Sequence, residues 1–191
     1  MKKTKAPDRL PTASRVLILV DESNVVSSVR SYSRNLDWLK LRDALVKAEE
    51  GRTLIEMVVY VGLPPAIPEW QTERDKKNKF LHWLRSHGFM VVAKDGSPSS
   101  EGQFKANVDV LMAIDAMELA QVMAPDIVVL VTGDADFAYL AVQLRRRGIR
   151  VEVAAAAPNL GSALRGSANE VIDLVPLFES YEPLAASAKI V

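Results

Sequence analysis

The chain has 191 residues, of which 49% are hydrophobic, and this is enough to form the core of one domain. Basic and acidic residues number 24 each, so any attraction to nucleic acid must come from local patches rather than from the net charge. The absence of cysteine excludes disulfides, thiolate nucleophiles and cysteine-ligated metal centres.

The N-terminal segment, residues 1–14, is basic and polar, and it is expected to form a flexible arm. It lacks the apolar stretch of a signal peptide. No apolar run in the chain approaches the ~20 residues that a membrane span needs. We therefore expect a cytoplasmic protein with no membrane partner.

From residue 15 onward, strands and helices are expected to alternate. Short apolar and β-branched runs predict strands at residues 15–20, 54–61, 89–93, 127–131, 149–154 and 171–174. Apolar side chains at helical spacing predict helices at residues 24–33, 36–50, 69–86, 104–123, 137–147 and 161–165, and residues 95–102 are expected to be a flexible loop. Such alternation predicts a three-layer α/β domain with a central parallel sheet over residues 15–175, followed by a tail over residues 176–191.

Two of the expected strands end in acidic residues. The first runs into Asp21 and Asn24, and the fourth runs into Asp134 and Asp136. If these strands are parallel neighbours, the four side chains converge at one edge of the sheet, and oxygen ligands there suit Mg²⁺ or Mn²⁺. The alternative is that Asn24 and one of the two later aspartates cap the helices that follow.

The expected helix over residues 104–123 supplies further charged residues. Asp109 lies one turn after Lys105, so the two can share a face, although the helix dipole by itself favours an acid near the helix start. Asp115 falls on the same apolar stripe as Val108 and Met112, where a carboxylate is costly unless it is hydrogen-bonded. We therefore expect a buried structural role for Asp115 rather than metal ligation.

A cluster of carboxylates without histidine or cysteine favours a particular chemistry. Neighbouring carboxylates raise one another's pKa unless a cation lies between them. A divalent cation can then lower the pKa of a water and stabilise the charge that develops on a phosphate. The pattern therefore favours metal-dependent phosphodiester hydrolysis over zinc chemistry.

Four segments together resemble the NYN domain, most closely its bacterial LabA-like branch within the PIN-like nuclease superfamily. They are Asp21-Glu22-Ser23-Asn24, Lys105 with Val108-Asp109-Val110, Thr132-Gly133-Asp134-Ala135-Asp136-Phe137, and Glu170-Val171-Ile172-Asp173-Leu174. The resemblance covers about residues 15–174. The chain departs from the family pattern at Thr132 and Ala135, where many relatives have serine, and at Asn169, where relatives often have aspartate.

The resemblance implies a Rossmann-like, PIN-like fold and a Mg²⁺- or Mn²⁺-dependent endoribonuclease that cleaves single-stranded RNA. The acids that it assigns to metal binding and catalysis are Asp21, Asp109, Asp134 and Asp136, with Asn24 as the accompanying polar residue. Lys105 and Arg165 are candidate substrate-binding residues, because both are expected near the acids. Two alternatives stay open: a non-catalytic RNA-binding or regulatory protein, and a protein-interaction domain that forms a homodimer through apolar helix faces.

Overall fold

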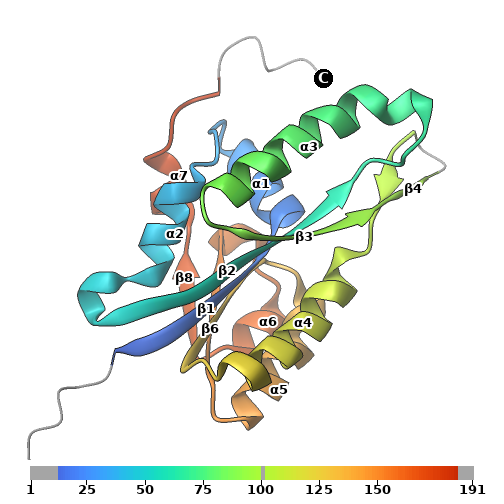
Figure 1. Ribbon diagram of the computed structural model, residues 1–191. Coiled ribbons are helices and arrows are strands. Elements are labelled where there is room, and N and C mark those ends of the chain that lie inside the picture. The colour runs from blue at the N-terminus through green and yellow to red at the C-terminus, as the bar shows by residue number, and fades with distance from the viewer. Residues whose placement is uncertain (1–12, 100–101, 185–191) are drawn as a thin grey trace, which may run out of the picture.

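A six-stranded parallel sheet forms the centre of the computed structural model, which describes residues 13–99 and 102–184 (Figure 1). The strand order is β3-β2-β1-β6-β7-β8, and every pair in it is parallel. The strands are β1 (Ser14–Asp21), β2 (Arg52–Leu63), β3 (Met90–Asp95), β6 (Ile127–Val131), β7 (Arg150–Ala155) and β8 (Glu170–Asp173). The expected arm over residues 1–14 lies almost entirely outside the described residues.

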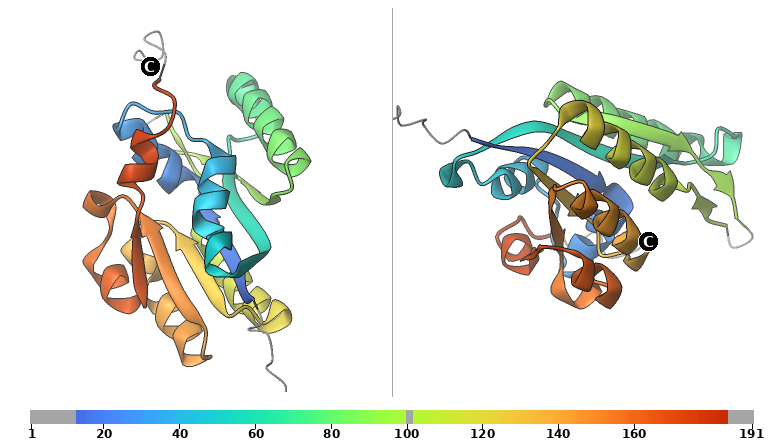
Figure 2. Two further views of the ribbon diagram at one scale, coloured as in Figure 1. Left: turned by 90° about the vertical axis from the view of Figure 1, so that its left-hand side faces the viewer. Right: turned by 90° about the horizontal axis from the view of Figure 1, so that it is seen from below.

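Helices cover both faces of the sheet, so the predicted three-layer α/β fold is confirmed (Figure 2). One face packs against α1 (Glu22–Ser31), α2 (Trp38–Val46), α3 (Gln71–Ser86) and α7 (Val175–Glu179). The other face packs against α4 (Val108–Met123), α5 (Ala138–Arg146) and α6 (Ser162–Ser167). The strands read as continuous apolar runs because side chains on both of their faces are buried. No helix within the described residues is long and apolar enough to cross a membrane.

The strand order reverses between β1 and β6. The chain adds β2 and β3 on one side of β1, then crosses to β6 and continues to β7 and β8 on the other side. Val20 of β1 pairs with Val131 of β6, so the two strands end side by side. In doubly wound sheets, ligands bind beyond the carboxyl ends of the strands at the point where the strand order reverses, the switch point. The acidic residues that follow β1 and β6 lie at this point.

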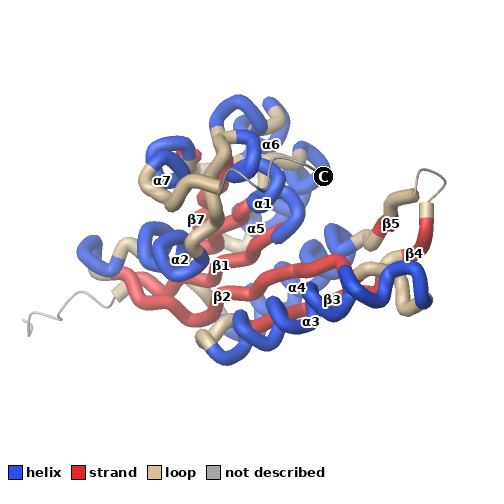
Figure 3. The backbone as a smooth tube through the Cα atoms, turned by 90° about the horizontal axis from the view of Figure 1, so that it is seen from above, coloured by secondary structure: helices blue, strands red, loops and turns tan. Residues whose placement is uncertain are grey.

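The expected helix over residues 104–123 begins four residues later than its apolar pattern indicates. Phe104–Lys105 instead forms β5, which pairs with β4 (Ser97–Pro98) in a small antiparallel hairpin (Figure 3). Phe104 makes an edge contact with Trp70, with ring centroids 5.4 Å apart, and its ring lies against Gly96. These tertiary contacts hold the segment extended, so Lys105 and Asp109 do not lie on the same helix as predicted. The predicted loop over residues 95–102 also contains a strand, β4.

Smaller differences lie at other element ends. The helix expected to run to residue 50 ends at Val46, because Lys47 adopts a left-handed conformation with φ of 51°, and a 3₁₀ turn follows. Short 3₁₀ turns also precede α3 and α5: η2 (Pro68–Trp70) and η3 (Ala135–Phe137). At the C-terminal end, Phe178 and Tyr181 are buried against the core, so packed structure continues past the expected boundary at residue 175.

Candidate functional site

Asp21 lies at the end of β1 and is almost fully buried, with 4% of its surface exposed. Its Oδ1 accepts hydrogen bonds from Ser23 Oγ (2.8 Å) and from the backbone N–H of Asn24 (3.2 Å), so it caps α1. Burial raises the pKa of the Asp21 carboxyl; these hydrogen bonds lower it, and the charges of Glu22 and Asp134 raise it again, so that the net shift is upward. The ionised form of Asp21 is therefore less favourable in the folded chain than in water.

The loop after β6 carries Asp134 and Asp136. Asp134 Oδ1 accepts from the backbone N–H of Asp136 (2.9 Å) and so caps the η3 turn, while Asp136 is exposed. Asn24 reaches this loop from α1, and its Oδ1 accepts from the backbone N–H of Gly133 (2.9 Å). Asn24 is thus not the α1 cap; it ties the loop that bears Asp134 to the helix that follows Asp21.

Gly133 is required at this position by a close approach of the backbone. A Cβ there would lie 2.3 Å from the carbonyl oxygen of Asn159. Asn159 Nδ2 in turn donates to Ser28 Oγ of α1 (2.9 Å). The β6 loop is therefore packed between α1 and the η4 turn (Ala157–Asn159), and its direction is set by both.

Asp109, in the first turn of α4, completes the acidic edge. Partial burial raises the pKa of its carboxyl, and the charges of Asp21, Asp134 and Asp136 raise it further, while Lys105 lowers it. Four carboxylates from three separate segments thus act on one another at the switch point. Within residues 13–99 and 102–184, no three acidic or histidine side chains stand close enough together to form a closed metal-ligand set.

The chemistry of these donors nevertheless suits a hard divalent cation. Every hydrogen bond that the described chain gives to the Asp21 and Asp134 carboxylates falls on Oδ1. Asp109 and Asp136 are exposed at the same edge. Binding of Mg²⁺ or Mn²⁺ relieves the repulsion between negatively charged oxygen ligands of this kind.

The family model of the NYN domain matches residues 15–177 of this chain. The chain belongs to the NYN domain family. A crystal structure of a protein of unknown function from Vibrio parahaemolyticus is similar, with 25% identity and a TM-score of 0.69 over 87% of this chain and 96% of that one. A nicotinamidase structure from Staphylococcus aureus aligns over 81% of this chain and 87% of its own, at 12% identity and a TM-score of only 0.37. No curated protein matches. Family membership indicates a nuclease-like, RNA-related function.

Asp115 of the NYN domain lies away from the acidic edge, half-buried in α4. It faces the fully buried Tyr60 of β2. Burial raises the pKa of the Tyr60 hydroxyl, and the neighbouring Asp115 carboxylate raises it further. The Tyr60 hydroxyl has no hydrogen-bond partner among the described residues, so the structural role expected for Asp115 stays a prediction.

A groove of about 540 Å³ opens beside Asp21, between α1, α3 and the β4–β5 hairpin. Three cationic side chains line it: Arg30, Lys77 and Lys105. Lys77 Nζ is held by both carboxylate oxygens of Glu22, each at 2.8 Å, so its charge is largely compensated. Sequence reasoning found Lys105 but not Arg30, although Ser23, Ser27 and Arg30 recur at helical spacing along one face of α1.

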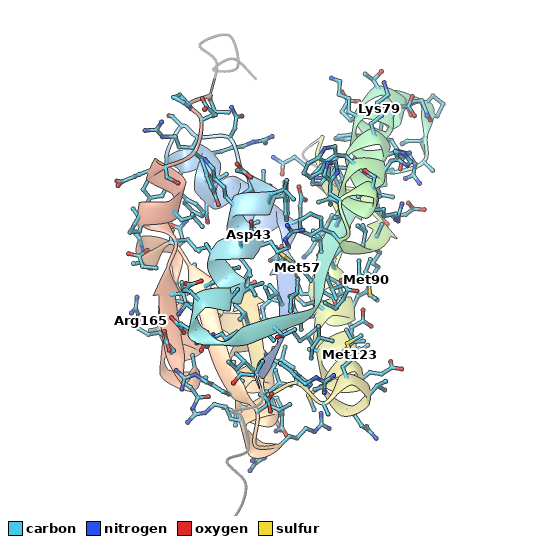
Figure 4. All side chains as sticks on the ribbon, turned by 60° about the vertical axis from the view of Figure 1, so that its left-hand side comes forward. Asp43, Met57, Lys79, Met90, Met123 and Arg165 are labelled. Atoms are coloured by element: carbon cyan, nitrogen blue, oxygen red, sulfur yellow. The ribbon has the colours of Figure 1, made fainter. Side chains whose placement is uncertain are left out.

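The second basic candidate, Arg165, lies on α6, which packs on the same face of the sheet as α4 and α5 (Figure 4). Among the described residues, no hydrogen bond or ion pair joins its side chain to the four aspartates. Its role in substrate binding stays a prediction.

Proposed function

We propose that this NYN domain is a metal-dependent endoribonuclease of the LabA-like branch, which hydrolyses phosphodiester bonds of single-stranded RNA. One observation carries the proposal. Asp21, Asp109, Asp134 and Asp136 are gathered from three segments at the switch point of a parallel sheet, where burial raises the pKa of Asp21 and Asp109 and the charges of neighbouring acids raise it further.

The four aspartates are the hard oxygen donors that would bind Mg²⁺ or Mn²⁺ at this edge, and binding would have to bring three or more of them closer together than they stand in the described residues. When bound, the ion supplies a more acidic water and positive charge against the phosphate. Residues of the chain orient the aspartates. Ser23 orients Asp21 through Oδ1, and Asn24 holds Gly133 so that Asp134 follows in a set direction.

The groove beside Asp21 supports a polyanionic substrate. Arg30 and Lys105 are exposed there, and among the described residues neither side chain forms an ion pair with an acid. Cations of this kind bind backbone phosphates without regard to sequence. Glu22 and Ser23, which directly follow Asp21 in the chain, line the groove, so a strand whose phosphates lie there would pass next to the acidic edge.

Asparagine substitutions test the proposal without removing the helix caps, since asparagine caps helices as well as aspartate does. Asp21→Asn and Asp134→Asn should each slow cleavage of labelled single-stranded RNA in Mn²⁺ by about 100-fold or more. Asp43→Asn is the matched control, because Asp43 is an exposed aspartate of α2 (Figure 4), and it should cleave like wild type.

A plain capping role would give the opposite pattern. Wild-type protein would then cleave no RNA in Mg²⁺ or Mn²⁺, and Asp134→Asn would match it in calorimetric Mn²⁺ binding and in RNA binding. That result would end the proposal.

A further inference from the structure

A second groove leaves the acidic edge in another direction. Helices α4 and α5 lie side by side on one face of the sheet (Figure 1), and a groove of about 580 Å³ runs between them. Its walls are largely aliphatic, formed by Val110, Ala113 and Met117 of α4 and by Leu140 of α5. The volume is within the range of pockets that bind small organic groups.

The head of this groove is shared with the acidic edge. Asp109 and Asp136 line both, so an occupant of the groove is contiguous with whatever binds at the aspartates. No lysine or arginine is among the described residues that line it. Arg147 reaches only its far end, where the guanidinium contacts the carbonyl oxygen and sulfur of Met117 at 3.3 and 3.2 Å. Lys105 acts on Asp109 from outside this groove, whereas the lining itself presents two carboxylates and no cation, so it disfavours phosphate and suits a neutral group.

The exposed side chains of the groove have the shape and polarity of a base-binding surface. Tyr139 is 70% exposed and Val110 is 56% exposed, and both line the groove. Aromatic rings in such positions stack on nucleobases. The amides of Asn107 and Gln143 stand at the same groove, and each offers both a donor and an acceptor to the edge of a base.

We propose that the α4–α5 groove binds an unpaired nucleobase of the RNA strand, next to the phosphodiester held at the aspartates, with Tyr139 stacking on that base. The inference rests on the proposed function, to which it adds a cause for single-strand preference. A base in a duplex is covered on both faces and along its pairing edge, so it must leave the stack to enter the groove.

Binding measurements test this without relying on turnover. The probe is a short fluorescein-labelled single-stranded RNA of mixed sequence, titrated by anisotropy in EDTA so that it is not cleaved. Tyr139→Ala should weaken binding by roughly 5- to 100-fold, the range for loss of one stacked base. Tyr139→Phe should retain the affinity because it keeps the ring. Val122→Ala, which removes an equally exposed apolar side chain of α4 outside the groove, should bind like wild type.

A series of RNAs that each lack one base identifies the occupant. Removal of the base at one position should weaken binding to the wild type as much as Tyr139→Ala does. Removal of the same base should not weaken binding to Tyr139→Ala any further, since the base and the Tyr139 ring form a single contact. Binding of the same strand annealed to its complement should not change with Tyr139→Ala.

Several results would overturn the inference: no RNA binding by wild type, equal affinity of wild type and Tyr139→Ala, or a dimer in light scattering that Tyr139→Ala dissociates with RNA affinity unchanged. The last would make this face a contact between two copies of the chain. Failure of the proposed function is distinct, because wild type would then cleave nothing in Mn²⁺ while Tyr139→Ala still lost RNA affinity.

Discussion

Asp21 serves two purposes at the end of β1. One of its oxygens caps α1 through Ser23 and Asn24, and the charge of its carboxylate faces the acidic edge. Burial raises its pKa in the folded chain above the ordinary value of 3.8. The folded state therefore binds this proton more tightly than the unfolded chain does, and the associated stability is lost as the pH rises through the folded pKa. At neutral pH the ionised side chain lowers stability unless a cation accompanies it.

Asp21→Asn is accordingly expected to stabilise the metal-free protein at neutral pH by on the order of 1 kcal/mol, because it removes the buried charge and keeps the cap. The gain should shrink as the pH falls and Asp21 becomes protonated. Urea unfolding in EDTA at several pH values measures this.

Mn²⁺ should reverse the order of the two proteins. At about 100 times its dissociation constant, an ion that binds only the folded state adds about 2.7 kcal/mol. Wild type should gain this and Asp21→Asn should gain much less. Equal gains in both proteins would show that Asp21 is not a ligand.

The β6 loop is the element on which the acidic edge depends most. Its backbone is held from two directions, since the N–H of Gly133 donates to Asn24 Oδ1 (2.9 Å) and its carbonyl accepts from the N–H of Gly161 (2.9 Å). The close approach to Asn159 leaves no room for a side chain at residue 133. The direction in which Asp134 leaves β6 is thus determined by packing rather than by the turn itself.

Asn24→Ala should remove one of these two supports. It leaves the buried N–H of Gly133 without its acceptor, so the free energy of unfolding should fall by about 1–3 kcal/mol. Asn78→Ala on the exposed face of α3 is the matched control and should change it by less than about 0.5 kcal/mol. Urea unfolding measures the stability of both variants. Equal stability of the two would contradict the supporting role of Asn24.

Across the whole molecule, the two ends of the sheet differ in how acidic side chains are paired with cations. At the amino ends of the strands, Glu152 is fully buried and paired with Arg52 (2.9 Å) and Arg150 (2.8 Å). Burial by itself would raise the pKa of Glu152, but the hydrogen bonds from both arginines outweigh it and hold the pKa below its usual value. At the carboxyl ends, Glu22 is paired with Lys77 and Asp95 with Arg74, whereas within residues 13–99 and 102–184 none of the four aspartates of the acidic edge forms an ion pair. The aspartates expected to bind a ligand are thus the acids left without a cationic partner, while Glu152 and Glu22 are compensated.

Arg52→Met tests the structural end of the sheet. Because the pKa of Glu152 is lowered in the folded state, its contribution to stability is present above the unfolded value of 4.5 and is lost as the pH falls through the folded pKa. The substitution should lower the free energy of unfolding by about 1.5–3 kcal/mol at pH 7, the range for one hydrogen bond to a charged group, because Arg150 still pairs with Glu152.

The cost of Arg52→Met should decrease at low pH, where Glu152 is protonated in both proteins. Arg85→Met, on the exposed surface of α3, should have little effect at any pH. A cost of Arg52→Met that stays constant between pH 7 and pH 3 would rule out the ion pair as its cause.

Much of the fold follows from local pattern. The apolar run over residues 127–131 has the same bounds as β6, because a strand buried on both faces must be continuously apolar. The strands and helices alternate as expected, because a parallel crossover needs a helix. The placement of Asp21 and Asp134 at one edge follows as well, since the carboxyl ends of parallel strands meet there. Periodicity could not locate the start of α4, where packing of Phe104 on Trp70 prevails over helical spacing.

By itself, the sequence determined the alternating α/β order, the parallel sheet and the residues that follow its strands, because each of these depends on neighbours within a few positions. Only the tertiary structure decided that Asn24 holds Gly133, that Glu22 neutralises Lys77, and that α4 and α5 leave an apolar groove beside Asp109. Asn24 and Gly133 are 109 residues apart in the chain, and Glu22 and Lys77 are 55 apart. Contacts of this range exist only once the sheet has brought the segments together, so no local pattern encodes them.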